Sequence, residues 1–166
     1  MKENLWTLAN TVLQEVNSFF SEDEWKVNES SCQWTLHFEG KCNHGDILGS
    51  TEVYPYERML HTEIVLPVDL NGLPAKEVLP FVNEVNRQSS SGIFFIDNRN
   101  IFLRNTLFYA ESVPSSEAIS NHYILLMDSA AYFTDLLNKC LAKPANKLKE
   151  RFGQFADQND LFPGQN

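Results

Sequence analysis

Apolar residues recur every three or four positions near the start of the chain. This spacing places them on one stripe of a helix over residues 5–20. The stripe consists of Leu5, Leu8, Ala9, Val12, Leu13, Val16, Phe19 and Phe20. Residues 21–24 are polar and acidic, which suits a connection rather than a core element. The pattern predicts an amphipathic first helix followed by a turn.

The pattern then changes to a period of two, which is typical of strands with one buried and one solvated face. The alternating apolar residues are Cys32, Trp34, Leu36 and Phe38. Residues 40–46 concentrate turn-forming residues, and residues 47–54 and 58–66 show a β-like pattern that ends at a proline in each case. This region predicts a meander of three antiparallel strands.

A second helix and a hairpin follow. Pro74 lies where a first helical turn begins, and residues 89–92 close the helix. Its apolar stripe consists of Val78, Phe81, Val82 and Val85. Residues 93–96 and 101–109 are rich in β-branched and aromatic residues and flank a turn over residues 97–100. Two more strands are expected there.

The longest apolar stripe begins after Ser115, Ser116 and Glu117, which favour a helix start. Its members are Ile119, Tyr123, Leu126, Ala130, Phe133, Leu137 and Cys140, and the flanking residues Leu125, Tyr132 and Leu136 widen it. The steps alternate between three and four residues, as in a heptad pattern. One helix seldom buries such a wide stripe against a small sheet alone.

These elements predict an α+β domain of the two-layer sandwich type. We expect an antiparallel five-stranded sheet with helices on one side, in the order α-β-β-β-α-β-β-α, because strands and helices do not alternate singly. The domain is expected to span residues 1–143. Residues 144–166 are expected to form a short helix and a flexible tail, since Pro144 interrupts the long helix.

Composition and charge narrow the possible functions. With 166 residues, of which 43% are hydrophobic and 21% charged, the chain can form one independent core. Its net charge of −9 argues against binding to nucleic acid or to anionic membranes, which relies on clustered Lys and Arg. We find no signal peptide and no apolar run of membrane-spanning length, so we expect a cytoplasmic protein.

Reactive side chains are dispersed along the chain. Cys42, His44 and Asp46 could reach one soft metal ion, but a structural zinc site needs four ligands at recognisable spacing. We therefore interpret this segment as a turn and expect no metal and no cofactor. We interpret Cys32, Cys42 and Cys140 as separate, reduced thiols. The alternative is a contact between Cys32 and Cys42 across neighbouring strands. Any redox role of the thiols stays open.

Other polar candidates have a simpler structural interpretation. Asp97, Arg99 and Arg104 could bind a carboxylate, but local ion pairs at the hairpin are the preferred interpretation. His37 and His61 fall on the polar phase of their strands and should face solvent. No phosphate-binding, zinc-protease, serine-hydrolase or calcium-loop motif occurs. We expect a protein without catalytic residues.

The width of the last helical stripe is the best functional signal. Most of the stripe should belong to the core, but its extra width can leave apolar surface for a second protomer or a client segment. The candidate protein interface consists of Tyr123, Leu125, Leu126, Tyr132, Phe133 and Leu136.

Several segments of the chain resemble the YbjN-like family of bacterial proteins, which shares the fold of type III secretion chaperones. The segments that carry the resemblance are residues 78–86, 92–97 and 101–104 and the helix from Ser115, within a likeness over residues 5–141. The resemblance implies the α-β-β-β-α-β-β-α sandwich, frequent dimers, and chaperone-like or regulatory protein binding. It implies no catalytic residues.

Together, these patterns predict a non-enzymatic protein–protein interaction module that acts as a homodimer with a partner of unknown identity. The alternative is a small-molecule-binding regulatory domain with an apolar pocket between sheet and helices. That pocket would be lined by residues such as Trp34, Phe94 and Tyr123, with Arg104 as polar anchor.

Overall fold

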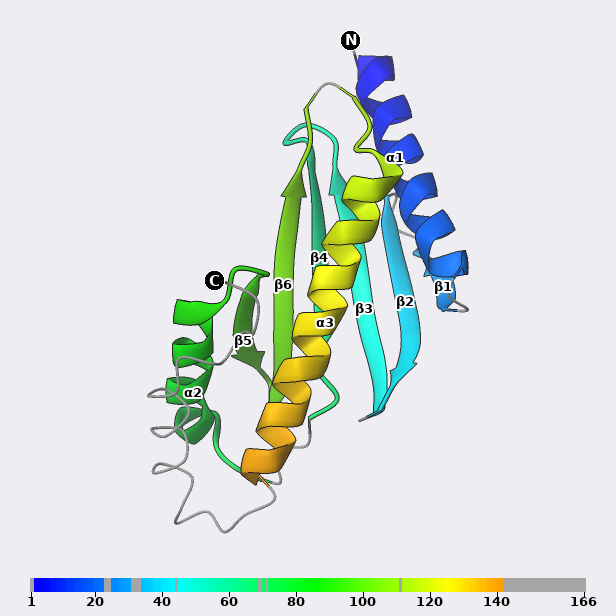
Figure 1. Ribbon diagram of the computed structural model, residues 1–166. Coiled ribbons are helices and arrows are strands. Elements are labelled where there is room, and N and C mark those ends of the chain that lie inside the picture. Colours follow the sequence, from blue (N-terminus) through cyan, green and yellow to red (C-terminus); the bar gives the residue numbers. More distant parts are fainter. Residues whose placement is uncertain are drawn as a thin grey trace.

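A computed structural model describes residues 2–22, 25–30, 34–43, 45–68, 70, 72–110 and 112–141. Three helices and six strands occur in these residues (Figure 1). They are α1 (Lys2–Glu22), β1 (Lys26–Glu29), β2 (Thr35–Cys42), β3 (Gly45–Tyr54), β4 (Met59–Val65), α2 (Ala75–Gln88), β5 (Ile93–Asp97), β6 (Asn100–Phe108) and α3 (Ser116–Leu141). The predicted short helix and tail over residues 144–166 lie outside the described residues.

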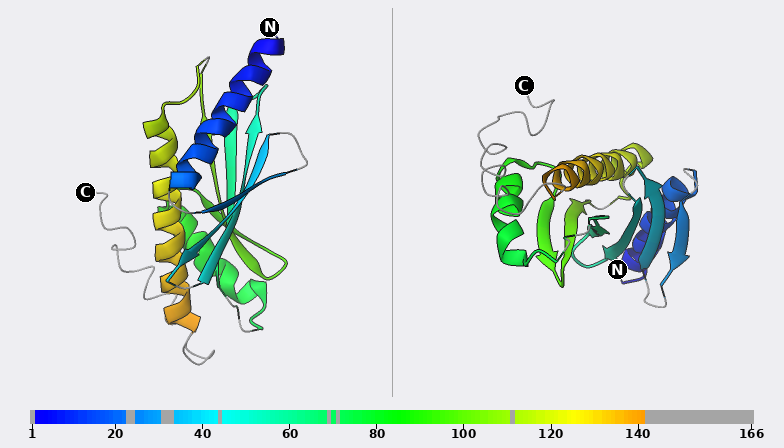
Figure 2. Two further views of the ribbon diagram at one scale, coloured as in Figure 1. Left: turned by 90° about the vertical axis from the view of Figure 1, so that its right-hand side faces the viewer. Right: turned by 90° about the horizontal axis from the view of Figure 1, so that it is seen from below.

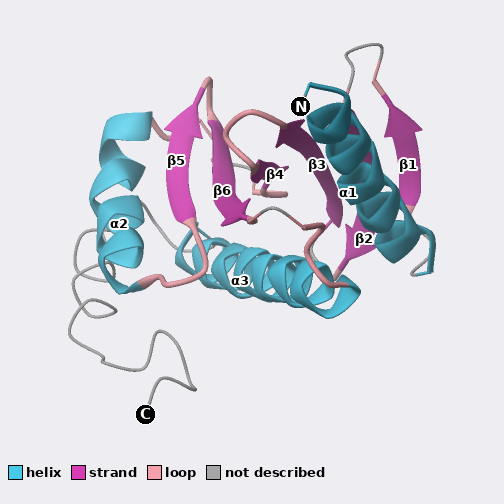
Figure 3. Cartoon of the chain, turned by 90° about the horizontal axis from the view of Figure 1, so that it is seen from above, coloured by secondary structure: helices cyan, strands magenta, loops and turns pink. Residues whose placement is uncertain are grey.

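The strands form one antiparallel sheet in the order β1-β2-β3-β4-β6-β5. Helices α1 and α3 lie side by side on one face of this sheet, as the two views of Figure 2 and the contacts between these elements show. Helix α2 lies beside β5 and closes that end of the core (Figure 3). The fold is therefore a two-layer α+β sandwich, and the predicted class is confirmed.

Alternation along the strands builds the core between sheet and helices. On β4, Leu60, Thr62 and Ile64 are buried, whereas the residues between them are only half-buried. Aromatic rings join the layers: Phe20 of α1 stacks on Phe38 of β2 with ring centroids 4.3 Å apart. Because every strand directs one residue in two to the helices, the other half of the sheet's side chains lies on the opposite face.

The prediction of five strands is wrong, because a sixth strand, β1, precedes the meander. The observed order is α-β-β-β-β-α-β-β-α. Strand β1 has four residues, and Val27 is its single apolar side chain, so it carries no alternating pattern. Pairing with β2, in which Val27 lies opposite Phe38, holds it in the sheet.

The first predicted strand is also displaced along the chain. Cys32 lies outside the described residues, Trp34 sits in a turn with φ 65°, and β2 runs from Thr35 to Cys42. Gly40, which suggested a turn, belongs to the strand. A Cβ atom at Gly40 would lie 2.3 Å from the ring of Trp25, so the glycine makes room for the indole. Among the described residues of this segment, Asn43 is the turn residue, and β3 begins at Gly45.

The predicted hairpin over residues 97–100 is confirmed. Asp97 pairs with Asn100, and the two residues between them, Asn98 and Arg99, have positive φ angles of 46° and 75°. Positive φ at both central residues is the feature of the two-residue turns that match the twist of a hairpin.

The edge of the sheet at β5 is closed by a side chain of α2. Asn86 donates a hydrogen bond from its amide nitrogen to the carbonyl oxygen of Phe94 and accepts one from the Phe94 N–H, both at 2.6 Å. These bonds satisfy backbone groups that an edge strand otherwise leaves free for pairing with another chain. A partner segment would therefore have to displace Asn86 to pair with β5 at this point.

Candidate functional site

The face of the sheet opposite α1 and α3 carries no helix among the described residues (Figure 2). We call it the open face. The strand register aligns its side chains in rows, one of which joins His37, Ser50, Glu63, Arg104 and Ile93 across five strands. His37 and His61, which we predicted to face solvent, both belong to this face. His37 is exposed, and His61 is half-buried.

An apolar band crosses the open face next to that row. Leu48 of β3 lies opposite Val65 of β4, Val65 opposite Phe102 of β6, and Phe102 opposite Phe95 of β5. The rings of Phe95 and Phe102 stack with centroids 5.1 Å apart. Leu48 is 49% exposed, and the other three side chains are half-buried. Four strands thus present continuous apolar surface where a single exposed residue would be unremarkable.

Glu63 is the centre of the polar row beside this band. Its Oε1 atom accepts a hydrogen bond of 2.7 Å from Nε of Arg104, forms an ion pair with Nη2 of the same residue at 2.5 Å, and lies 3.4 Å from Nε2 of His61. The guanidinium of Arg104 also lies 4.5 Å from the centre of the Phe95 ring, within the range of a cation–π contact. The Glu63 carboxylate therefore holds the Arg104 side chain in place directly beside the apolar band.

A second carboxylate perturbs a tyrosine at the end of β3. The Tyr54 hydroxyl donates a hydrogen bond of 2.6 Å to Glu52. This bond to a carboxylate, together with partial burial, raises the pKa of Tyr54 to about 12, because the hydroxyl proton is held and a phenolate would be repelled. Tyr54 is therefore a hydrogen-bond donor, not a base, at neutral pH.

The polar row and the apolar band meet at a shallow hollow of about 210 Å³. Its lining includes apolar side chains of Leu48, Val65 and Phe102 and polar side chains of His37, Ser50 and Glu63. Within the described part of the chain, the side chains of His37 and Ser50 have no hydrogen-bond partner, and every contact of the Glu63 carboxylate is made by Oε1. The hollow thus offers apolar walls together with polar atoms that can still accept or donate hydrogen bonds.

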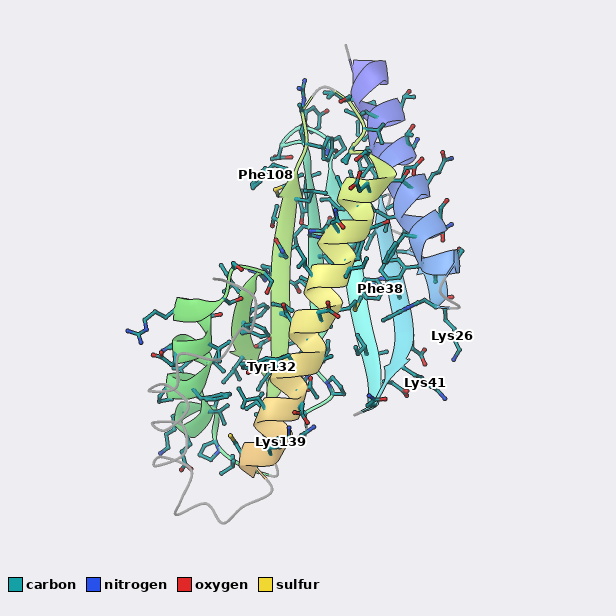
Figure 4. The ribbon with its side chains drawn as sticks, in the orientation of Figure 1. Lys26, Phe38, Lys41, Phe108, Tyr132 and Lys139 are labelled. Carbon is teal, nitrogen blue, oxygen red and sulfur yellow. The ribbon has the colours of Figure 1, made fainter. Side chains whose placement is uncertain are left out.

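The predicted interface residues on α3 divide into two groups. The side chains of Tyr123, Leu126, Phe133 and Leu136 are buried in the core of the domain. Leu125, 58% exposed, and Tyr132, 37% exposed, reach the surface of α3, on which Figure 4 labels Tyr132. Ile124, which the sequence analysis did not single out, is also exposed. The outward surface of α3 is therefore smaller than the predicted set of six.

A buried polar cluster links α3 to the middle of the sheet. The Tyr123 hydroxyl lies 2.7 Å from the Thr51 hydroxyl, which lies 3.0 Å from that of Thr62, and Nε2 of His122 is 3.4 Å from Thr62. Burial lowers the pKa of His122 to about 4, because the charged imidazolium is poorly solvated there. The apolar phase of α3 next to Tyr123 was the only sequence signal for this burial. The cluster satisfies core hydroxyls and holds α3 in register.

The remaining sequence candidates do not converge. Arg104 lies on the open face and Phe94 and Tyr123 on the core side, while the ring of Trp34 contacts that of Trp6 in α1 at a tilt of 32°. The four residues of the ligand-pocket alternative therefore do not line one cavity. Arg104 pairs with Glu63, not with the predicted hairpin acid.

The cysteine and metal candidates are only partly described. His44 and Cys32 lie outside the described residues, and Cys140 is buried in the core. Within the described residues, no group of three or more His, Cys, Asp or Glu side chains is arranged to hold a metal ion. The expectation of separate thiols at Cys32 and Cys42, with a contact between them as the alternative, stays a prediction.

Comparisons of the chain with family models, curated proteins and solved structures give no match. None of the described helices is long and apolar enough to cross a bilayer. The apolar residues of the open face did leave a signal in the sequence. Leu48, Phe95 and Phe102 each stand next to a core residue, so their strands carry adjacent apolar residues where strict alternation would place a polar one.

Proposed function

We propose that this protein is a non-enzymatic interaction module that binds a segment of another protein on the open face. The observation that supports the proposal is the apolar band of Leu48, Val65, Phe102 and Phe95, which lies on a face without a covering helix in the described residues. Exposed apolar surface rimmed by polar residues is typical of protein interaction sites. A chaperone-like or regulatory role in the cytoplasm, and kinship with YbjN-like proteins, belong to the same proposal.

The small-molecule alternative has less support. The hollow has about 210 Å³ and is open, whereas ligand pockets usually enclose about 300–1,000 Å³. A shallow hollow within a wider apolar band suits a side chain of a bound polypeptide better than an enclosed ligand.

A matched pair of substitutions tests the binding surface. Leu48 on the open face and Leu79 on α2 are exposed to almost the same extent, 49% and 46%. The purified chain and its Leu48→Gln and Leu79→Gln variants would be used as baits in the source organism's extract, and recovered proteins quantified by mass spectrometry. We expect Leu48→Gln to lower recovery of the partner about fivefold or more and Leu79→Gln to leave it unchanged.

Equal recovery by both variants would place the binding surface elsewhere, provided that thermal melting shows both to be folded. Recovery of no protein by the unchanged chain would count against the interaction module itself.

Self-association is a separate part of the proposal. The outward surface of α3, with Ile124, Leu125 and Tyr132, is available for a second copy of the chain. Light scattering should then give a dimer for the unchanged chain and a monomer for Leu125→Gln. A dimer that persists in Leu125→Gln but dissociates in Leu48→Gln would transfer the dimer contact to the open face.

A further inference from the structure

The chemistry of the hollow on the open face indicates which kind of segment it accepts. Three of its side chains, Leu48, Val65 and Phe102, are apolar, and Glu63 brings a negative charge to its border. A lysine or arginine side chain combines an apolar stem with a cationic end, so it can contact both kinds of wall at once. A purely apolar side chain would leave the carboxylate and the neighbouring hydroxyl of Ser50 without hydrogen bonds to the partner.

The hydrogen-bonding state of the hollow agrees with a donor-rich occupant. The two donors that Glu63 already has, Arg104 and His61, both contact Oε1. The Oε2 atom has no partner in the described residues and can accept a further hydrogen bond, as can the hydroxyl of Ser50. The carboxylate is 30% exposed, so a cation from outside can reach it without complete desolvation.

Charges of both signs lie near the hollow, since Lys26 lies 3.4 Å from Glu39 and Arg104 pairs with Glu63, but three carboxylates outnumber these two cations. Glu39 lies opposite Leu48 in the strand register, and Glu52 and Glu63 follow on β3 and β4. The chain as a whole carries a net charge of −9. Such a field attracts cationic segments and disfavours acidic ones.

We propose that the hollow of the open face receives a lysine or arginine side chain from a partner segment in which apolar residues flank that cation. The flanking residues contact the apolar band, and the cation binds the Glu63 carboxylate. This inference rests on the proposed function, since it names the partner chemistry of the same face.

Random peptides displayed on phage are the probe for the first test. Selection against the full chain should enrich peptides that contain Lys or Arg next to apolar residues. Enrichment of acidic or uncharged peptides, or of none, would overturn the inference.

Titration of one enriched peptide by calorimetry then assigns the contact. Glu63→Gln should weaken binding about tenfold, because it removes a charge-assisted hydrogen bond. Arg104→Gln removes the same ion pair but frees the carboxylate, so it should tighten binding by up to about fivefold. A peptide with norleucine in place of the lysine should bind the unchanged chain and Glu63→Gln equally.

The opposite responses of the two variants separate binding from folding. If Glu63→Gln and Arg104→Gln weaken binding alike, the ion pair acts through the structure of the face, and the inference is wrong. If Leu48→Gln weakens binding of the peptide but Glu63→Gln does not, the open face binds the peptide and the assignment of the cation to Glu63 is wrong. If no peptide binds and the unchanged chain recovers no partner, both proposals fail.

Discussion

The two faces of the sheet are made by the same strands but have opposite properties. On the core face, one row consists of Phe38, Gly49, Ile64, Leu103 and Phe94, and the four side chains other than the glycine are buried. On the open face, the row displaced by one residue joins His37, Ser50, Glu63, Arg104 and Ile93. A shift of one position thus separates side chains that pack in the core from side chains on the open face.

Close packing constrains the core face far more strongly than the open face. Gly49 shows this, because a Cβ atom there would lie 2.2 Å from the ring of Phe38 and 2.9 Å from the carbonyl oxygen of Glu63. No comparable restriction applies to the exposed Leu48 and the half-buried Ser50 on either side of it. Substitutions on the two faces should therefore differ in kind, affecting stability on one and binding on the other.

The largest expected difference is between two phenylalanines. Phe94 on the core face is 1% exposed and stacks on Phe133 at 4.1 Å, whereas Phe108, on the open face at the end of β6 (Figure 4), is 72% exposed. Phe94→Ala should lower the free energy of unfolding by about 3–5 kcal/mol, because it leaves a cavity. Phe108→Ala should change it by no more than about 0.5 kcal/mol. Urea unfolding of both variants tests the contrast, and equal losses would refute it.

The next effect concerns a buried histidine on the core side. The pKa of His122 is about 4 in the folded protein and about 6.5 in an unfolded chain. Between these values, the unfolded state takes up a proton that the folded state does not, so the free energy of unfolding falls as pH falls from 6.5 to 4. The full loss is about 3 kcal/mol and is complete below pH 4.

Between pH 6.5 and 4, the free energy of unfolding should change less with pH for His122→Gln than for the unchanged chain. Urea unfolding at several pH values gives this profile. The open face supplies the control: Leu48 is exposed and carries no titratable group, so Leu48→Gln should leave the profile as it is. If the profiles of His122→Gln and the unchanged chain run parallel, His122 is not the titrating group.

Sequence patterns predicted the elements with long or strict periodicity and missed those without it. The stripe of α2, from Val78 to Val85, and the hairpin turn at Asn98 and Arg99 are as expected, because spacing and turn chemistry act locally. Strand β1 was missed, because Val27 is its one apolar residue and the strand depends on pairing with β2. Gly40 was interpreted as part of a turn. The glycine is needed because the ring of Trp25 packs against it, and that ring comes from a distant segment, so the local sequence gives no sign of it.

The candidate site was harder to predict than the fold. The sequence located apolar excess on α3, where Leu125 and Tyr132 are indeed exposed, but four of the six chosen residues are in the core. The open face depends on register: Glu63 and Arg104 are 41 residues apart and meet only because β4 pairs with β6. Adjacent apolar residues in β3, β5 and β6 were the available hint that both faces of the sheet carry apolar surface.

Each face has a tyrosine hydroxyl in a short hydrogen bond, so the contributions of these two bonds to stability can be compared. On the core side, the Tyr123 hydroxyl is buried 2.7 Å from that of Thr51, and on the open face the Tyr54 hydroxyl binds Glu52 at 2.6 Å. Tyr123→Phe should lower the free energy of unfolding by about 1–2 kcal/mol, since the buried Thr51 hydroxyl loses one of its two hydrogen-bond partners. Tyr54→Phe should cost less than about 1 kcal/mol, because water can replace the lost bond. Thermal or urea unfolding decides between them, and a larger loss for Tyr54→Phe would contradict the assignment of the faces.

The smallest effect is the contribution of the Glu63–Arg104 ion pair to stability. The pair has favourable geometry, with Arg104 contacting one carboxylate oxygen through both Nε and Nη2, but its side chains are 30% and 45% exposed. Solvent screens such a pair, so a double-mutant cycle with Glu63→Gln and Arg104→Gln should give a coupling energy of about 0.2–1 kcal/mol. The coupling should fall further when NaCl is added. A coupling energy above about 2 kcal/mol would mean that the ion pair stabilises the fold. The polar residues of the open face would then contribute to stability as those of the core face do. A small coupling leaves Glu63 dispensable for folding, as a residue kept for binding a partner should be.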